Sequence, residues 1–318
     1  MLMHLADTAV GMGAVAVDMV YMVNELPEAD GLCRILSTQV SDGGGCGNAL
    51  VQLSRLGAPT AVLGQVGDDD AGNRIRRSLE EAGVDTSWLL TRTSGTSMVT
   101  HVYLDSVGRK MIALDLGDSL LTVDLHKLDV DEISRAKLFY TTMFPPDPAL
   151  AVARALRARG GNVVFNLQGG TRLMEAVGAT RDMIAEMIAL SDLVSLGRVS
   201  AANLLGTDDP SDVFCRIRRD YGCRGTVVFT LGSSGSIVNS RGATWEIPAF
   251  PVKAVDTTGA GDSFTAAFAY ACYYLNMSPE AAGRFASAAS AITCTKMGAR
   301  SSPDLAKIRL LLEGGGAR

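Results

Sequence analysis

Short apolar runs alternate with longer amphipathic segments through most of the 318-residue chain. The apolar runs have the length and residue types of buried strands. They are Ala61–Leu63, Lys137–Tyr140, Asn162–Phe165, Leu193–Ser195 and Thr226–Leu231. The helical segments between them are Gly47–Leu56, Ala71–Ala82, Pro148–Arg159, Ser211–Tyr221 and Asp262–Leu275. This alternation predicts an α/β fold, a three-layer α/β/α sandwich with a mostly parallel sheet.

Two stretches interrupt the alternation, Gly31–Gln39 and Ser97–Leu114. In the second, Met98–Leu104 and Lys110–Leu114 flank the turn Asp105–Gly108, which predicts a hairpin. Extra antiparallel strands beside a parallel sheet would form a small β lid over its carboxyl edge, where such sheets bind ligands. We therefore expect a single domain over residues 1–318, with lid segments at about 14–42 and 96–115.

Composition excludes several classes of protein. With 47% hydrophobic and 20% charged residues, the chain is typical of a globular protein. A net charge of −5 gives no basic field for nucleic acid, and the apolar run Ala9–Val23, interrupted by Asp18, is too short to cross a membrane. The six cysteines form no C-x-x-C pair, which favours reduced thiols and a cytoplasmic protein over disulfides or zinc.

The strongest chemical motif is the run D-T-T-G-A-G-D-S-F from Asp256 to Phe264. It lies between the strand-like segment Val252–Val255 and the helix that begins near Asp262. The small residues Gly259, Ala260 and Gly261 allow successive backbone N–H groups to surround an anion at a helix start. Asp262 could merely cap that helix, but a carboxylate beside an anion cradle is better explained as a base that deprotonates a hydroxyl.

This motif resembles the carboxyl-terminal signature of the ribokinase, or PfkB, family of carbohydrate kinases. The run Gly43–Asn48 resembles the family's glycine signature, Thr230–Gly235 its nucleotide-binding turn, and Phe285–Gly298 the segment that closes the adenine pocket. The resemblance spans almost the whole chain. It implies an ATP-dependent phosphotransferase that phosphorylates a hydroxyl of a small sugar or sugar-like molecule, with a primary alcohol favoured.

The resemblance also implies roles for individual residues. Asp262 would be the general base, and the backbone of Gly259, Ala260 and Gly261 the anion hole. The residues expected to bind the sugar are Asp18, Gly44 and Asn48, and those expected to line the ATP site are Thr230, Gly232, Gly235 and Ser287. Taken singly, each has a plainer explanation, such as Asp18 opening a turn or the glycines forming a flexible loop.

The sequence offers positions for two kinds of metal ion. Asp256 and Thr258 fall where some relatives bind a monovalent cation, with matching later positions at Thr293, Lys296, Gly298 and Ser302. Asp256 could equally order its own loop, so potassium stays open. The family's N-x-x-E pair near the magnesium is replaced here by Gly197 and Ser200. We therefore expect Mg²⁺ to be held through water and the nucleotide phosphates.

Other functions stay open at this point. A nucleoside kinase of the same fold is the nearest alternative, and a non-catalytic homologue that binds small molecules is another. The segment Gly11–Ala16 is a loose dinucleotide fingerprint that raises a nicotinamide-dependent oxidoreductase, while the sequence has no G-x-x-x-x-G-K-[ST] motif. Edge strands of the lid would be shielded by a second copy, which predicts a homodimer.

Overall fold

The computed structural model describes residues 5–107 and 109–314. Within them, the main sheet has ten strands in the order β14-β13-β12-β11-β10-β9-β1-β4-β5, and β6 also pairs with β4. These strands are β1 (Ala9–Met12), β4 (Thr60–Gly67), β5 (Val84–Asp85), β6 (Leu89–Arg92), β9 (Leu138–Thr141), β10 (Asn162–Leu167), β11 (Leu193–Gly197), β12 (Thr226–Thr230), β13 (Ser236–Ser240) and β14 (Ala243–Ile247). Only β12–β13 and β13–β14 pair antiparallel among the described strands of this sheet, which confirms the mostly parallel prediction.

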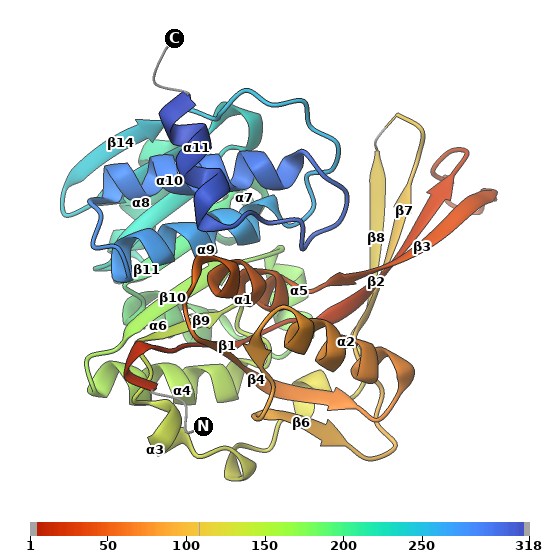
Figure 1. Ribbon diagram of the computed structural model, residues 1–318, viewed down its shortest axis with the longest axis horizontal. Helices are drawn as coiled ribbons and strands as arrows, with labels where there is room; N and C mark the ends of the chain where they lie inside the picture. Colours follow the sequence, from red (N-terminus) through yellow and green to blue (C-terminus); the bar gives the residue numbers. More distant parts are fainter. Residues whose placement is uncertain (1–4, 108, 315–318) are drawn as a thin grey trace.

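Helices cover both faces of this sheet (Figure 1). One layer contains α3 (Val130–Ile133), α4 (Pro146–Ala158), α5 (Thr171–Ala176), α6 (Arg181–Leu190), α7 (Arg198–Leu205) and α8 (Pro210–Arg219). The other contains α1 (Gly45–Leu56), α2 (Asp70–Glu81), α9 (Ala260–Tyr273), α10 (Pro279–Cys294) and α11 (Leu305–Gly314). Short 3-10 helices lie at η1 (Leu5–Asp7), η2 (Leu120–Thr122), η3 (Leu125–Lys127) and η4 (Gly232–Ser234). The three-layer α/β/α sandwich is confirmed.

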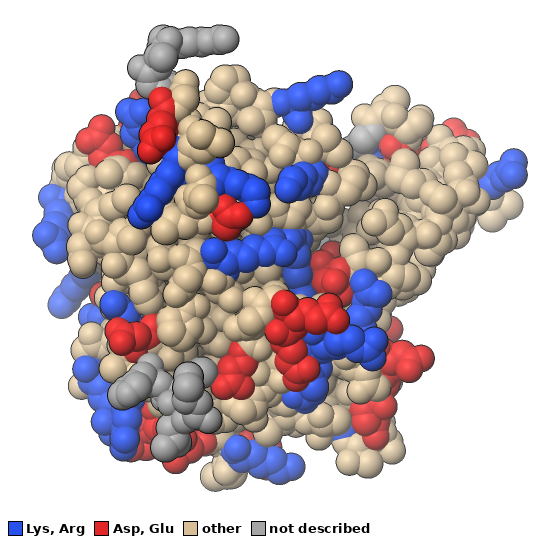
Figure 2. Space-filling view, in the orientation of Figure 1, with Lys and Arg blue, Asp and Glu red and all other residues tan. Residues whose placement is uncertain are grey.

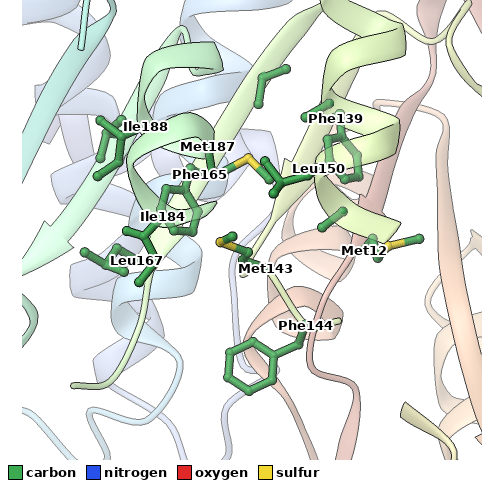
Figure 3. Close-up of a cluster of buried hydrophobic side chains, with 14 of the residues drawn as sticks. Met12, Phe139, Met143, Phe144, Leu150, Phe165, Leu167, Ile184, Met187 and Ile188 are labelled. Atoms are coloured by element: carbon green, nitrogen blue, oxygen red, sulfur yellow. The ribbon is translucent and has the colours of Figure 1, made fainter. Parts of the chain in front are cut away.

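Each parallel strand is buried on both faces because its side chains alternate between the two helical layers. In β9, Phe139 packs with α4 and α6, while Leu138 and Tyr140 face the opposite layer. Figure 3 shows the cluster around Phe139 and Phe165, both fully buried. Burying one such side chain contributes about 2 to 3 kcal/mol, so this cluster holds the carboxyl ends of β9 and β10 in place.

A second, four-stranded sheet projects beside the main body (Figure 1); we call it the small sheet. Its strands, in the order β3-β2-β7-β8, are β3 (Ile35–Gly43), β2 (Ala16–Val23), β7 (Val99–Leu104) and β8 (Lys110–Asp115). The predicted hairpin is confirmed as the antiparallel pair β7–β8, although Gly108 of its turn lies outside the described residues.

The centre of the small sheet differs from the sequence prediction, because β2 and β7 pair parallel rather than antiparallel. The reason lies in the main sheet. Strands β2 and β7 follow β1 and β6, which both run parallel to β4, so the chain leaves the main body in the same direction each time.

A second correction concerns Val252–Val255, which the sequence presented as a strand and which is irregular in the structure. The N–H groups of Val255 and Asp256 both donate to the carbonyl of Cys294 at the end of α10, at 2.8 and 3.3 Å, instead of to a neighbouring strand. The antiparallel pair β13–β14 occupies the sheet edge. None of the helices in the described part of the chain is long and apolar enough to cross a membrane.

Candidate active site

Helix α9 begins at a turn that only glycine can form. Gly259 has φ 76°, and a Cβ added there would lie 2.2 Å from the carbonyl oxygen of Ala299. The first backbone bond of the helix runs from Ser263 N–H to Gly259 O at 2.9 Å. The N–H groups of Gly261 and Asp262 precede that bond and carry the positive end of the helix dipole. One N–H group of the predicted anion cradle is already used, because Ala260 N–H donates to the carbonyl of Thr257 at 3.2 Å. The cradle therefore has fewer N–H groups for an anion than the sequence predicted.

Asp262 lies in the first turn of α9 and is buried. Asn48 Nδ2 donates to its Oδ2 at 2.8 Å, Asn166 Nδ2 donates to its Oδ1 at 3.2 Å, and Gln168 Nε2 also donates to Oδ1. Asp262 forms no ion pair with any described residue. Burial raises the pKa of Asp262 to about 6, against the opposing effect of the three amides. Its carboxyl can therefore exchange a proton near neutral pH.

The three amides come from separate parts of the chain. Asn48 is in the first turn of α1, Asn166 is near the carboxyl end of β10, and Gln168 follows that strand. Asn166 Nδ2 also donates to the hydroxyl of the buried Tyr140 at 2.8 Å. Sequence reasoning assigned Asn48 to the sugar and gave no role to Asn166 or Gln168. The one sequence signal for Asn166 and Gln168 was their position at the carboxyl end of a parallel strand, where α/β sheets bind ligands.

Asp18 lies beyond Asp262, in β2 of the small sheet, and is also buried. Burial raises its pKa, opposed by a hydrogen bond with Thr100 of β7 and by the charge of Arg300. The glycine loop encloses this carboxylate closely, since a Cβ on Gly43 would lie 2.2 Å from both of its oxygens. At Gly44, φ is 84° and a Cβ would lie 2.5 Å from the carbonyl oxygen of Ala14. The structure thus brings Asp18, Gly44 and Asn48 to one side of Asp262.

A cavity of about 460 Å³ lies at the start of α9, the helix that carries Asp262. It is lined by Thr230, Gly232, Ser233, Gly235, Ala249, Phe250, Pro251, Val252, Ala254, Thr257, Ala260, Gly261, Phe264, Ser287, Ser290, Ala291 and Cys294. All four residues predicted for the ATP site are among them. Gly261 faces open space, since a Cβ there would contact nothing within 4 Å. The cavity joins apolar walls to the N–H groups of the α9 turn.

Asp256 and Thr258, the residues predicted for a monovalent cation, hydrogen-bond within their own loop. The Asp256 carboxylate accepts hydrogen bonds from Thr258 N–H at 2.9 Å, Thr258 Oγ1 at 2.7 Å and Gly298 N–H at 2.9 Å. Burial opposes ionisation, but these bonds outweigh it and lower the pKa of Asp256. The carboxylate therefore orders its loop. No carboxylate lines the cavity, and the described residues contain no group of three or more His, Cys, Asp or Glu suited to a metal ion.

Comparisons with known proteins agree with this geometry. A family model described as pfkB family carbohydrate kinase matches residues 8–305. The chain is 33% identical over 293 residues to an ATP-dependent ribose-1-phosphate kinase of Halopiger xanaduensis, covering 92% of this chain and 93% of that protein. It is 29% identical over 307 residues to the ribokinase of Mus musculus, covering 93% and 92%. The structure of Arabidopsis thaliana ribokinase complexed with ribose and ATP matches with a TM-score of 0.81 at 24% identity, covering 96% of this chain and 99% of that one.

The likeness to this solved structure shows the ribokinase fold, and Asp262 lies in the first turn of helix α9. The chain belongs to the pfkB family of carbohydrate kinases and is an enzyme of that family. The oxidoreductase alternative is therefore wrong. Its fingerprint glycines serve packing, because a Cβ on Gly11 would lie 2.9 Å from Leu50 and one on Gly13 would lie 2.3 Å from Thr142 Oγ1.

Proposed function

We propose that this protein transfers the terminal phosphoryl group of ATP to a hydroxyl of a small sugar, with Asp262 as the general base. The observation that carries the proposal is the position of Asp262. Its carboxylate is held by amides on the side of Asp18, and its helix begins at the wall of the 460 Å³ cavity. A base between two binding spaces is the arrangement that in-line phosphoryl transfer requires.

Asp18, Gly44 and Asn48 form what we call the acceptor side, the part of the site proposed to hold the alcohol that receives the phosphoryl group. Its oxygen atoms can accept hydrogen bonds from sugar hydroxyls. Asn48 Oδ1 is buried and has no hydrogen-bond partner among the described residues. The Asp18 carboxylate offers further acceptor positions. Because an unpaired buried acceptor is costly, a hydroxyl that donates to Asn48 gains the full benefit of satisfying it. We propose that Asp18, Gly44 and Asn48 bind the sugar.

In the reaction, ATP supplies the phosphoryl group. An acceptor hydroxyl donates its proton to the carboxylate of Asp262 as its oxygen attacks the γ-phosphorus in line, and the bond from that phosphorus to the β–γ bridging oxygen breaks, so that ADP leaves. The N–H groups of Gly261 and Asp262 stabilise the negative charge on the transferring phosphoryl oxygens. Thr230, Gly232, Gly235 and Ser287 hold the nucleotide against the apolar wall of the cavity.

Metal ions have a limited place in this proposal. Mg²⁺ would neutralise charge on the nucleotide, but the described residues that line the cavity offer hydroxyl and backbone groups and no carboxylate. These residues do not form a magnesium site of their own, so we assign no step to the ion and expect it to enter on the phosphates. Thr258 already donates two hydrogen bonds to the carboxylate of Asp256. The assay below therefore tests whether K⁺ changes the activity.

We further propose that the small sheet closes over the sugar as a lid, with segments 14–42 and 96–115 inserted in a single domain. It exposes Ile35, Leu36, Val40, Met111, Ile112 and Leu114. Figure 2 shows a largely uncharged surface over this sheet. Burial of these side chains against a second copy would form a homodimer.

We also propose that the protein works in the cytoplasm. This is supported by its free cysteines, which suit a reducing compartment: Cys33, Cys46, Cys215, Cys223, Cys272 and Cys294.

An ADP-release assay with Mg²⁺, with and without K⁺, tests the function. The acceptor panel contains ribose, fructose, ribose 1-phosphate, adenosine and inosine, and the Asp262→Asn variant is the blank. The proposal is supported if the wild-type protein phosphorylates a sugar and the Asp262→Asn variant does not. Preference for adenosine or inosine would instead identify a nucleoside kinase. Calorimetric binding of a sugar with no ADP release from any acceptor would identify a non-catalytic homologue.

A further inference from the structure

Arg300, in the segment between α10 and α11, reaches the glycine loop of the acceptor side. Its Nη2 donates to the carbonyl of Gly43 at 3.0 Å, and its Nη1 donates to Ser78 Oγ of α2 at 2.7 Å. The guanidinium passes the first turn of α1 at Gly47, where a Cβ would lie 2.7 Å from Nη2. The side chain thus occupies a space that a glycine keeps open.

The backbone next to Arg300 belongs to the other half of the site. Ala299 presents its carbonyl to the turn at Gly259, and Gly298 N–H donates to the carboxylate of Asp256. Arg55 of α1 fixes the segment by donating to the carbonyl of Ser302 at 2.8 Å. Residues 298–300 therefore connect the turn that begins α9 with the loop that surrounds Asp18.

The environment of Arg300 is a costly one for a cation. Its Nε is buried and has no hydrogen-bond partner among the described residues, and burial lowers the pKa of the guanidinium. It forms no ion pair with a described residue; the opposite charges that act on it are Asp42 and Asp18. Asp42 is already paired with Arg74 at 2.8 Å, whereas Asp18 forms no ion pair with a described residue. The hydrogen bond with Thr100 and the charge of Arg300 both lower the pKa of Asp18. A buried cation held by two neutral acceptors adds little to stability.

We propose that Arg300 is a positioning residue for the sugar acceptor. It holds the Gly43 carbonyl so that the loop backbone lies against Asp18, supplies the positive charge that faces this carboxylate, and ties both to the turn at Gly259. The inference rests on the proposed function of the same site. It goes beyond it by assigning acceptor binding to a residue that does not itself contact the sugar.

Kinetics of Arg300→Met test the first part. With the best sugar of the panel, we expect KM for the sugar to rise roughly tenfold or more, as for loss of a hydrogen bond to a charged group. The dissociation constant of ATP should change by less than about twofold. Arg300→Lys, which keeps the charge, should recover part of the sugar affinity. Arg216→Met is the matched control, because Arg216 also donates to a backbone carbonyl, that of Leu205 at 2.8 Å, away from the site.

A thermal double-mutant cycle tests the charge relation and needs no substrate. Asp18→Asn should leave the melting temperature of the wild type unchanged or lower at pH 8. In the Arg300→Met or Arg300→Gln background, Asp18→Asn should raise the melting temperature, because the substitution neutralises a buried carboxylate that has lost its cation. An equal effect of Asp18→Asn in both backgrounds, or equal losses of sugar and ATP affinity, would overturn the inference. A wild type that phosphorylates no sugar would instead overturn the proposed function, while the cycle still reports on Arg300.

Discussion

The two sides of Asp262 are built from different chemistry and from different lengths of chain. The cavity side, which is the 460 Å³ cavity at the start of α9, has apolar walls and main-chain N–H groups. The described residues that line it all come from residues 230–294. The acceptor side is made of carboxylate and amide groups from β2, the start of α1 and the end of β10. Shape and main-chain donors suit a nucleotide, whereas side-chain hydrogen bonds suit a polyol. Variants should therefore damage one side and spare the other, except at Asp262.

Asp262→Asn should produce the largest effect. Loss of a positioned base lowers turnover by roughly two to four orders of magnitude. ATP binding and the melting temperature should change little, because Asn48 can rotate its amide to satisfy the new side chain. The measurement is single-turnover ADP formation together with calorimetry of ATP. Asp212→Asn, an exposed acid in the first turn of α8, is the control. Near-normal turnover would remove Asp262 from the mechanism.

The pH dependence of kcat/KM should show the same base. Asp262 must be ionised to accept a proton, and its pKa is raised to about 6. Activity should therefore fall as pH decreases through about 6, by roughly tenfold per unit below it. A profile measured from pH 4.5 to 8 checks this, with the melting temperature recorded at each pH. A low-pH limb near 4 would indicate an unburied base.

Asp18→Asn should break the acceptor side alone. Loss of a charged hydrogen-bond partner should lower kcat/KM for the sugar by roughly 10- to 100-fold. The dissociation constant of ATP should stay within about twofold. Asp115→Asn in β8 of the same small sheet is a control, since Asp115 is exposed. A matched loss of ATP affinity would show that the two sides are not separable.

Ala291→Leu should break the cavity side, with the smallest effect. Ala291 is buried in α10 and lines the cavity, so a larger side chain occupies nucleotide space. Overpacking of this kind costs about 1 to 3 kcal/mol, which predicts a KM for ATP raised roughly tenfold and an unchanged KM for the sugar. Ala281→Leu on the exposed surface of the same helix is the control. Weakened sugar binding in steady-state assays would contradict the division.

Local sequence signals were sufficient for much of the cavity side. The residue types at Gly259 and Gly261 predict a turn and a helix start, and those at Gly232 and Gly235 predict a tight turn. These positions could therefore be predicted together with Asp262. The acceptor side was predicted only in part. The residue types of Gln168 and Arg300 give no signal, because a glutamine after a strand and an arginine in a loop are common on any surface.

The alternation of strands and helices could be predicted from the residues alone, since apolar periodicity is a local property of the chain. The positions where the backbone could turn with positive φ could be predicted in the same way, from the glycines. Three features could be seen only in the folded chain: the three amides that meet on one carboxylate, the parallel pairing of β2 and β7, and the place of Arg300 behind the glycine loop. These depend on which distant segments pack together, and that choice is made by burial of the whole core rather than by any short pattern.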